Sequence, residues 1–164
     1  MTRYVVMGVS GCGKSLIGAD FAAATGARFI DGDDLHPQAN IDKMRRGDPL
    51  DDKDRAPWLA KVGAALATDN TVIACSALKR SYRDQIRDTA GAPVTFLFLR
   101  GARETLLDRM ASRPGHFMPP SLLDSQLATL EPPGPDEHSL IQDIEQGPAR
   151  IVANFVTAIT ETSP

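Results

Sequence analysis

A stretch of eight residues near the start of the chain has the residue types and spacing needed to bind phosphate. It reads Gly8-Val9-Ser10-Gly11-Cys12-Gly13-Lys14-Ser15 and matches the pattern G-x-x-x-x-G-K-[ST]. Its glycines allow successive backbone N–H groups to point at one anion. We expect Lys14 to reach the β- and γ-phosphates of a nucleoside triphosphate and Ser15 to ligate Mg²⁺. The residues predicted to bind the nucleotide are Gly8, Gly11, Cys12, Gly13, Lys14 and Ser15, together with Arg109 farther along the chain.

The segments on either side place this stretch between a strand and a helix. Tyr4–Met7 is short and apolar, which predicts a buried strand. After the stretch, Ile17, Phe21 and Ala24 recur at helical spacing. A helix that begins near Lys14 directs its positive end at the same anion. Because strand, loop and helix follow in this order, a chance match in a glycine-rich turn explains the pattern poorly.

Carboxylates follow the second predicted strand, which spans Arg28–Ile30. Asp31 and Asp33 are two residues apart, so we expect them on one face of the strand, near the phosphate-binding stretch. Asp33 is the candidate general base that takes the proton of an acceptor hydroxyl. Asp31 is expected to act on the Mg²⁺ shell through water. We expect Asp34, by contrast, to cap the helix that begins near His36.

Basic residues follow the third predicted strand, Thr71–Ala74. Lys79, Arg80 and Arg83 fall at the start of a helix, where cations oppose the helix dipole. Residues placed against local preference are typical of functional sites, so the pattern predicts a site for an anion. A solvated basic face remains the alternative, above all for Arg80. Arg55, on the preceding predicted helix, is a further candidate cation.

A segment rich in proline follows the fourth predicted strand, Val94–Leu99. It begins with the predicted helix Glu104–Ser112, which carries Arg109, and Arg113 follows one turn later on the same face. We interpret Arg109–Pro135 as a lid that closes over the triphosphate, so that both arginines act on the transferring phosphoryl group. A static surface excursion is the alternative. The predicted catalytic residues are Lys14, Asp33, Arg109 and Arg113.

Buried strands alternate with helical segments along the chain, which predicts an α/β fold with a parallel sheet and helices on both faces. Glu137–Ile144 is a weak candidate for a fifth strand. Ligands of such sheets bind beyond the carboxyl ends of the strands, where the residues above fall. The 164 residues fit a single domain spanning 1–164, with the lid at about 109–135. Further helices are predicted over Gln38–Arg46, Ser121–Leu130 and Ala149–Ile159.

The composition argues against several classes of protein. A formal net charge of −3 gives no electrostatic reason to expect binding to nucleic acid or to an anionic membrane. No apolar run reaches the length of a membrane span, and the chain enters a strand too early for a signal peptide. Cys12 and Cys75, the only cysteines, predict neither a disulfide framework nor a zinc site. They suit the reducing cytoplasm.

These residues together predict phosphoryl transfer from ATP, with Mg²⁺, to a small acceptor. ATP is favoured over GTP because the Asp-x-x-Gly and Asn-Lys-x-Asp motifs of switch GTPases are absent. A nucleotide-dependent switch or regulatory ATPase is the alternative from a different class. It would hydrolyse ATP without an acceptor, whereas a kinase requires one.

The chain resembles the gluconokinases of the small P-loop kinase type over about residues 4 to 150. The most specific matches are Asp31-Gly32-Asp33-Asp34-Leu35-His36-Pro37 and Gly115-His116-Phe117-Met118. The resemblance implies a nucleoside-kinase-like fold, a homodimer and ATP-dependent phosphorylation of D-gluconate to 6-phospho-D-gluconate. Leu127 departs from the pattern, because the family usually has an aromatic residue there.

The resemblance also implies how gluconate is held. The cations are candidate partners for its carboxylate, where arginine is the better bidentate donor, and Asp33 and the histidines are candidates for its hydroxyls. Shikimate remains an alternative acceptor, although Cys75-Ser76-Ala77 replaces the glycine triplet of shikimate kinases. A nucleotide acceptor, as in adenylate kinase, fits the cations less well. The predicted gluconate-binding residues are Asp33, His36, Arg55, Lys79, Arg83 and His116.

Overall fold

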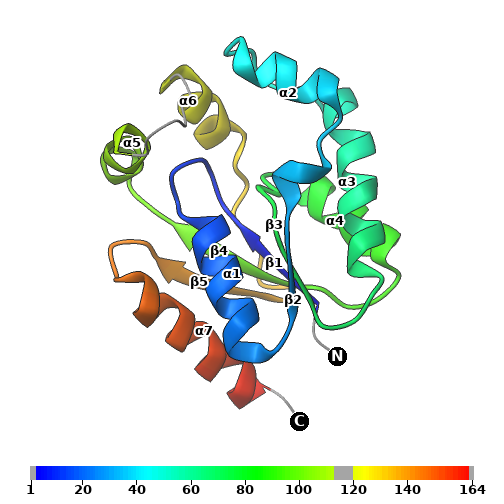
Figure 1. The fold of residues 1–164 in the computed structure, drawn as a ribbon, viewed down its shortest axis with the longest axis vertical. Coiled ribbons are helices and arrows are strands. Elements are labelled where there is room, and N and C mark those ends of the chain that lie inside the picture. Colours follow the sequence, from blue (N-terminus) through cyan, green and yellow to red (C-terminus); the bar gives the residue numbers. More distant parts are fainter. Residues whose placement is uncertain (1–2, 113–119, 163–164) are drawn as a thin grey trace.

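The computed structural model describes residues 3–112 and 120–162, which form a five-stranded parallel sheet flanked by helices (Figure 1). The strand order is β2-β3-β1-β4-β5, so the first strand lies at the centre. The predicted α/β class and all the predicted strands, including the weak fifth, are confirmed. The strands are β1 (Arg3–Met7), β2 (Arg28–Asp31), β3 (Thr71–Ala74), β4 (Thr95–Arg100) and β5 (Ser139–Asp143).

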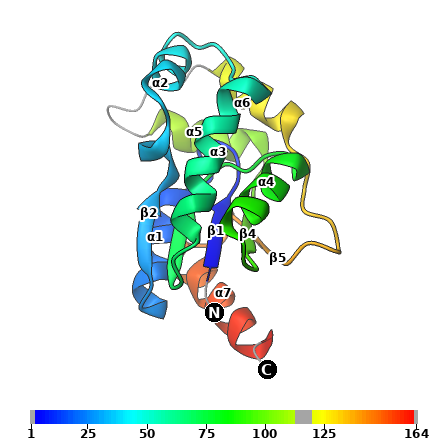
Figure 2. The ribbon, with the colours of Figure 1, turned by 90° about the vertical axis from the view of Figure 1, so that its right-hand side faces the viewer.

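Helices cover both faces of the sheet. α1 packs with α7 on one face, and α3 packs with α4 on the other (Figures 1 and 2). A short 3₁₀ helix, η1, follows β2 directly. The helices are α1 (Lys14–Thr25), η1 (Gly32–Leu35), α2 (Gln38–Arg45), α3 (Asp52–Leu66), α4 (Arg80–Ala90), α5 (Arg103–Ala111), α6 (Pro120–Thr129) and α7 (Pro148–Thr162).

Burial explains why the central strands were readable from the sequence and β5 was less so. Val5, Val6 and every residue of β3 are buried, as expected for strands covered on both faces. β5 lies at the sheet edge and has no fully buried residue, which accounts for its weaker apolar pattern. Cys12 and Cys75 are both buried and free. Among the described residues, no helix combines the length and apolar character needed to cross a membrane.

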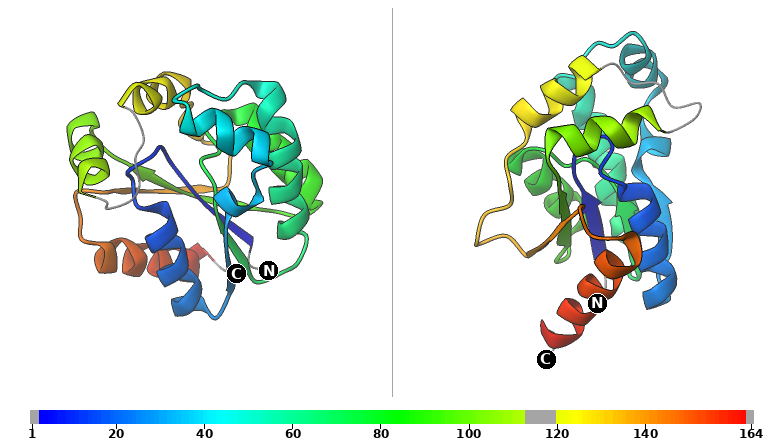
Figure 3. Two further views of the ribbon diagram at one scale, coloured as in Figure 1. Left: turned by 45° about the horizontal axis from the view of Figure 1, so that its top comes forward. Right: turned by 90° about the vertical axis from the view of Figure 1, so that its left-hand side faces the viewer.

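Three helices gather at the carboxyl end of the sheet. α2, α5 and α6 surround the loop that follows β1 (Figure 3). α5 packs directly on that loop, since a β-carbon added at Gly11 would lie 2.7 Å from the backbone oxygen of Leu106. α2 is tied to α3 by an ion pair of 2.7 Å between Lys43 and Asp54. The fold therefore places its candidate site at this end of the sheet.

Two local predictions in the segment after β2 were wrong. β2 ends at Asp31, so Asp33 lies in η1 and does not share a strand face with Asp31. Asp34 does not cap α2, whose N-cap residue is Pro37 with no side-chain bond. Asp31 instead caps η1 by accepting a hydrogen bond from the backbone N–H of Asp33. β2 thus ends one residue later than the predicted Ile30, and this cap turns the chain into η1 before Asp33.

Candidate active site

The phosphate loop, Gly8–Ser15, has the backbone conformation that its glycines permit. The φ angles of Gly8, Gly11 and Gly13 are 151°, 84° and 87°, values that side chains with a β-carbon rarely adopt. Gly13 is also the N-cap residue of α1, so the loop leads directly into the positive end of that helix. The predicted strand–loop–helix unit is therefore present. A glycine-rich loop that leads into a helix N-terminus is an arrangement suited to binding a phosphate.

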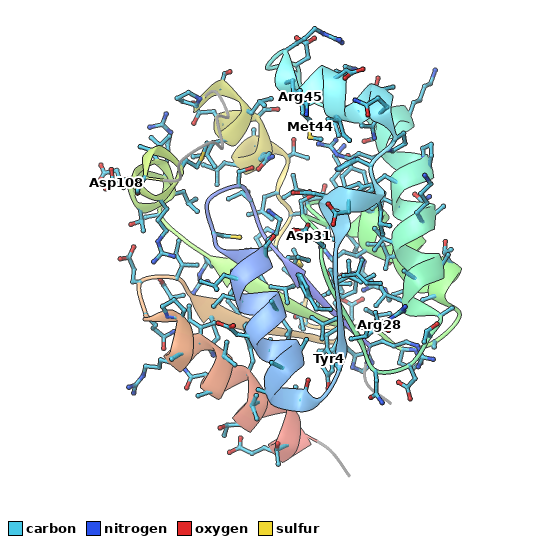
Figure 4. All side chains as sticks on the ribbon, in the orientation of Figure 1. Tyr4, Arg28, Asp31, Met44, Arg45 and Asp108 are labelled. Carbon is cyan, nitrogen blue, oxygen red and sulfur yellow. The ribbon has the colours of Figure 1, made fainter. Side chains whose placement is uncertain are left out.

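The two residues predicted to act on Mg²⁺ lie together. The Ser15 hydroxyl donates a hydrogen bond of 2.9 Å to Oδ2 of Asp31, and Oδ1 of Asp31 accepts from the Asp33 N–H. Figure 4 shows Asp31 at the end of β2. A β-carbon on the next residue, Gly32, would lie 2.3 Å from the Ala74 oxygen, so only glycine allows this close approach to β3. A hydroxyl and a carboxylate beside a phosphate loop are ligands that suit Mg²⁺.

A cavity of about 440 Å³ lies next to the phosphate loop. It brings together Lys14, Asp33, His36 and Arg55, all of which the sequence singled out. Its volume falls in the range typical of small-molecule sites. The other described residues of its lining are Ser10, Ile41, Met44, Arg45, Asp48, Pro49, Leu50, Trp58, Ser76, Leu78, Leu122, Ser125 and Gln126.

His36 is held in a fixed orientation at the wall of the cavity. Its ring stacks on Trp58 with centroids 4.0 Å apart and an interplanar angle of 16°. The Trp58 indole N–H in turn donates to the backbone oxygen of Gly32, which ties the stack to η1. Burial lowers the pKa of His36 to about 4, assisted by the charge of Arg55 and opposed by that of Asp33. His36 is therefore neutral at physiological pH.

Arg55 and Lys79 meet at Tyr82 but occupy different positions relative to the cavity. Arg55 donates to the backbone oxygen of Leu50 and to the Tyr82 hydroxyl, at 2.7 and 2.9 Å. The Tyr82 hydroxyl donates to Asp52, which also pairs with the Lys79 ammonium at 3.3 Å. Arg55 lines the cavity, whereas Lys79 lines only an adjoining open surface depression. Of these two predicted carboxylate partners, only Arg55 reaches the cavity.

Arg83 does not lie at the cavity, contrary to the sequence prediction. Its guanidinium is fully buried and pairs with Glu137 through bonds of 2.7 and 3.1 Å. Its Nη1 group donates to the backbone oxygens of Ala77 and Leu78. Arg80 likewise pairs with Asp136, at the surface. The cations at the start of α4 are thus balanced by carboxylates of this chain, which corrects their interpretation as one anion site.

The lid arginines are only partly within the described residues. Arg109 belongs to α5, which packs on the phosphate loop at Gly11. Burial raises the pKa of the Cys12 thiol, and the charges of Lys14 and Arg109 act to lower it. The Arg109 guanidinium donates to the backbone oxygen of Ile144, a partner that the sequence did not indicate. Arg113 and His116 lie outside the described residues.

Three cavity residues were missed or undervalued in the sequence. Arg45 lines the cavity from α2 (Figure 4), and its guanidinium makes no hydrogen bond or ion pair with another residue of the ranges 3–112 and 120–162. Its place in the last turn of α2, where a cation suits the helix dipole, gave no signal of function. Gln126 of α6 accepts a bond of 2.7 Å from the Ser10 N–H of the phosphate loop. Trp58 is almost fully buried and also forms part of the cavity wall.

The strand order, the central phosphate loop and a cavity that joins its lysine to a carboxylate define a P-loop kinase of small molecules. A family model described as an AAA domain matches residues 4–133. The thermosensitive gluconokinase of Escherichia coli strain K12 is 49% identical over 163 residues, covering 95% of this chain and 86% of that protein. The chain belongs to the gluconokinase family, which confirms the resemblance found in its sequence.

Solved structures agree with this assignment. A gluconokinase from Sinorhizobium meliloti 1021 superposes with a TM-score of 0.87 at 46% identity, covering 99% of this chain and 98% of that one. A shikimate kinase from Bacteroides thetaiotaomicron has a TM-score of 0.73 at 16% identity, over 97% and 98% of the two chains. The second match shows a shared fold alone.

Proposed function

We propose that the protein transfers the γ-phosphoryl group of ATP to the 6-hydroxyl of D-gluconate. The observation that carries this proposal is one cavity that joins Lys14 of the phosphate loop to the carboxylate of Asp33 and to two guanidinium groups, Arg45 and Arg55. A phosphate donor, a proton acceptor and cations for a carboxylate are what an ATP-dependent kinase of a sugar acid requires. The relatives named gluconokinases support gluconate as the acid.

The chemistry asked of the chain is mainly positioning and charge stabilisation. The phosphate-loop N–H groups and Lys14 would hold the β- and γ-phosphates. Asp33 would accept the proton of the 6-hydroxyl as that oxygen attacks phosphorus. Arg109 would stabilise the transferring group after leaving the Ile144 oxygen, with Arg113 beside it. Closure of residues 109–135 would exclude water and so prevent hydrolysis of ATP.

Ser15 and Asp31 are the residues that would hold Mg²⁺. Mg²⁺ sites in kinases use one or two protein oxygens together with substrate phosphates and water, which suits a hydroxyl and a carboxylate 2.9 Å apart. The ion supplies neutralisation of the charge on the phosphate oxygens. The chain contributes the orientation of both ligands, because the Asp33 N–H fixes the second oxygen of Asp31.

Arg55 is the proposed main partner of the gluconate carboxylate, with Arg45 as a second cation. Leu50 and Tyr82 engage one terminal nitrogen of Arg55, which leaves donors for a bidentate contact. Arg45 brings a charge that the described part of the chain does not balance by an ion pair. Arg83 is left out of the proposed set because its donors are engaged in the interior.

The proposal is tested by ADP release in a coupled assay with ATP and Mg²⁺. Gluconate, other sugar acids, shikimate, AMP and buffer alone are compared as acceptors. We expect turnover only with a sugar acid, highest with gluconate, and phosphate on O6 by NMR of the product. Equal ADP release with and without an acceptor would show that the protein is an ATPase and not a kinase. Turnover with AMP or shikimate but with no sugar acid would show that gluconate is not the acceptor.

The proposed homodimer, cytoplasmic location and lid closure have separate support and tests. The homodimer rests on the family resemblance alone, and light scattering after size exclusion measures the mass in solution. The location rests on the two free cysteines and is tested by cell fractionation.

Lid closure predicts that backbone hydrogen exchange in α6 slows when an ATP analogue and gluconate are both bound. Unchanged exchange in that ternary complex would exclude a moving lid.

A further inference from the structure

Asn40 of α2 is buried, with 3% of its surface exposed. Its side-chain amide contacts His36, which lies four residues earlier in the chain. The Asn40 Nδ2 lies 2.8 Å from the backbone oxygen of Asp54 and 3.2 Å from Nδ1 of His36. A backbone carbonyl can only accept a hydrogen bond, so the amide atom facing Asp54 must be the nitrogen. That nitrogen carries two hydrogens, one for each neighbour. Nδ1 of His36 must therefore accept.

This requirement selects one form of the imidazole. An imidazolium has a hydrogen on both nitrogens, and so does not accept at Nδ1. The neutral ring with hydrogen on Nε2 is the form that fits. The Trp58 stack holds the ring in place at the cavity wall. Within the described part of the chain, Nε2 has no hydrogen-bond partner, so its N–H is available to a ligand in the cavity.

We propose that Asn40 is a positioning residue that fixes His36 as the neutral Nε2–H tautomer, so that His36 donates a hydrogen bond to an oxygen of the bound sugar acid. The ligand in this proposal rests on the proposed function, whereas the tautomer does not. A carboxylate such as Asp33 offers the cavity only acceptor oxygens, whereas His36 in this tautomer offers the cavity only its Nε2–H donor. Together they match two neighbouring hydroxyl groups of a polyol chain. One hydroxyl donates its hydrogen to Asp33, and the oxygen of the other accepts from His36.

The spacing of the pair supports a joint role. Asp33 lies in η1 and His36 is the C-cap residue of η1, three positions later. Side chains three residues apart in a 3₁₀ turn eclipse one another, so both project from the same side of the turn. Both line the cavity. An acceptor that lacks the hydroxyl facing His36 would leave the Nε2–H of a largely buried ring unpaired, which costs affinity.

The first test needs no substrate. The chain has three histidines, so long-range ¹H–¹⁵N spectra of the ¹⁵N-labelled protein resolve them, and His36→Gln assigns the signal of interest. We expect His36 as the Nε2–H tautomer at pH 7, with an unprotonated Nδ1. A protonated Nδ1 would overturn the proposal. Because this spectrum is recorded on the free protein, its result is independent of whether gluconate is the acceptor.

The second test replaces the amide donor by an acceptor. In Asn40→Asp the introduced carboxylate accepts a hydrogen bond from Nδ1, which favours the tautomer with hydrogen on Nδ1 and raises the pKa of His36. At a pH above that raised pKa, the neutral ring therefore carries no hydrogen on Nε2. Loss of one hydrogen bond to the substrate predicts a KM for gluconate about two- to tenfold higher at pH 8. KM should recover as the pH is lowered, because the imidazolium regains its Nε2–H. The wild-type KM should show no such recovery.

Controls separate this effect from a general loss of structure or a change of charge. Gln38→Glu makes the same chemical change on the exposed side of α2 and should leave KM unchanged. The charged groups around His36 are Asp33 and Arg55, with Lys14, Arg45 and Asp48 also on the cavity wall, and both variants retain them. A KM rise that is the same at every pH, or no rise at all, would overturn the proposal.

A further pair of variants covers the case in which Asn40→Asp does not fold. The side-chain nitrogen of glutamine reaches about as far as Nε2 of histidine, and that of asparagine about as far as Nδ1. His36→Gln should therefore keep a lower KM for gluconate than His36→Asn, although both lose the Trp58 stack. The opposite order would show that the Nε2–H is not the group that binds.

Discussion

The replacement Glu137→Gln tests the finding that Arg83 is a structural residue. Both side chains are almost fully excluded from solvent. Glu137 accepts from Nε and Nη2 of Arg83, from Arg87 and from the Gly134 N–H. Glutamine keeps the shape but removes the charge, and its NH₂ group must face donors. Arg83 would then remain buried without a counter-charge, which is the costly arrangement.

Two arguments give the size of this effect. Breaking a buried ion pair by removing one partner typically costs about 3–5 kcal/mol. Burial alone would raise the pKa of Glu137, but hydrogen bonds from Arg83, Gly134 and Arg87 hold it down at about 2, against an ordinary value of 4.5. That fall in pKa corresponds to about 3 kcal/mol. For a chain of this length we expect a Tm lower by about 6–20 °C.

The assay is thermal unfolding followed by circular dichroism, with Asp136→Asn as the matched control. Asp136 directly precedes Glu137 and pairs with Arg80, but the side chains of Asp136 and Arg80 are exposed, at 61% and 47%. Exposed pairs contribute about 0–1 kcal/mol, so the control should lose at most about 4 °C. An equal Tm loss in both variants would refute the structural role. A KM for gluconate raised about tenfold or more in folded Glu137→Gln would return Arg83 to the substrate site.

The pH dependence of the difference is a second check on the same reasoning. A carboxyl whose pKa is lowered by folding contributes stability above its ordinary pKa, here 4.5, and loses it as the pH falls toward about 2. The gap in unfolding free energy between the wild type and Glu137→Gln should be constant near neutral pH. It should narrow steadily below about pH 4.5. A gap that widens in acid would contradict the assigned sign.

Three further predictions concern the cavity. Lys14→Ala should abolish gluconate phosphorylation with an unchanged circular dichroism spectrum, because Lys14 is not a core residue; normal turnover would remove the phosphate loop from the site. Asp33→Asn should lower kcat by about 10²- to 10⁴-fold with little change in the KM for ATP, and a fall below about threefold would exclude Asp33 as the base. Arg55→Lys keeps the charge but loses the planar fork, so the KM for gluconate should rise several-fold in initial-rate assays, and an unchanged KM would assign the carboxylate to Arg45.

Patterns contained within a few consecutive residues were enough to predict the framework. The apolar run of β1, the glycines of the phosphate loop and the helical spacing in α1 each depend on neighbours along the chain. Burial repeats with the period of the element, so the sequence alone indicates which segments are strands and helices. Asp31 and Asp33 were also correctly placed near the loop, since parallel strands end at one edge of the sheet. Only the turn that separates them differed from the expectation.

The partner of each charged side chain was a matter of tertiary structure. Lys79, Arg80 and Arg83 looked like one anion site because their carboxylates lie 27, 56 and 54 positions away. Nothing in the local pattern distinguishes a cation that is already paired from one that is free. Arg45 is the opposite case. Its position at the end of a helix gave no indication of function, but the fold places it on the cavity wall.

The sequence by itself therefore determined the fold class, the phosphate loop and the carboxylates that follow β2, because their physical basis is local. Only the tertiary structure decided which polar groups are available to a ligand. Asn40 shows the reason most directly, because its amide is oriented by the backbone oxygen of Asp54, 14 positions away, and that orientation sets the tautomer of His36. Hydrogen bonds are directional and short, so their pattern depends on how distant segments pack against one another.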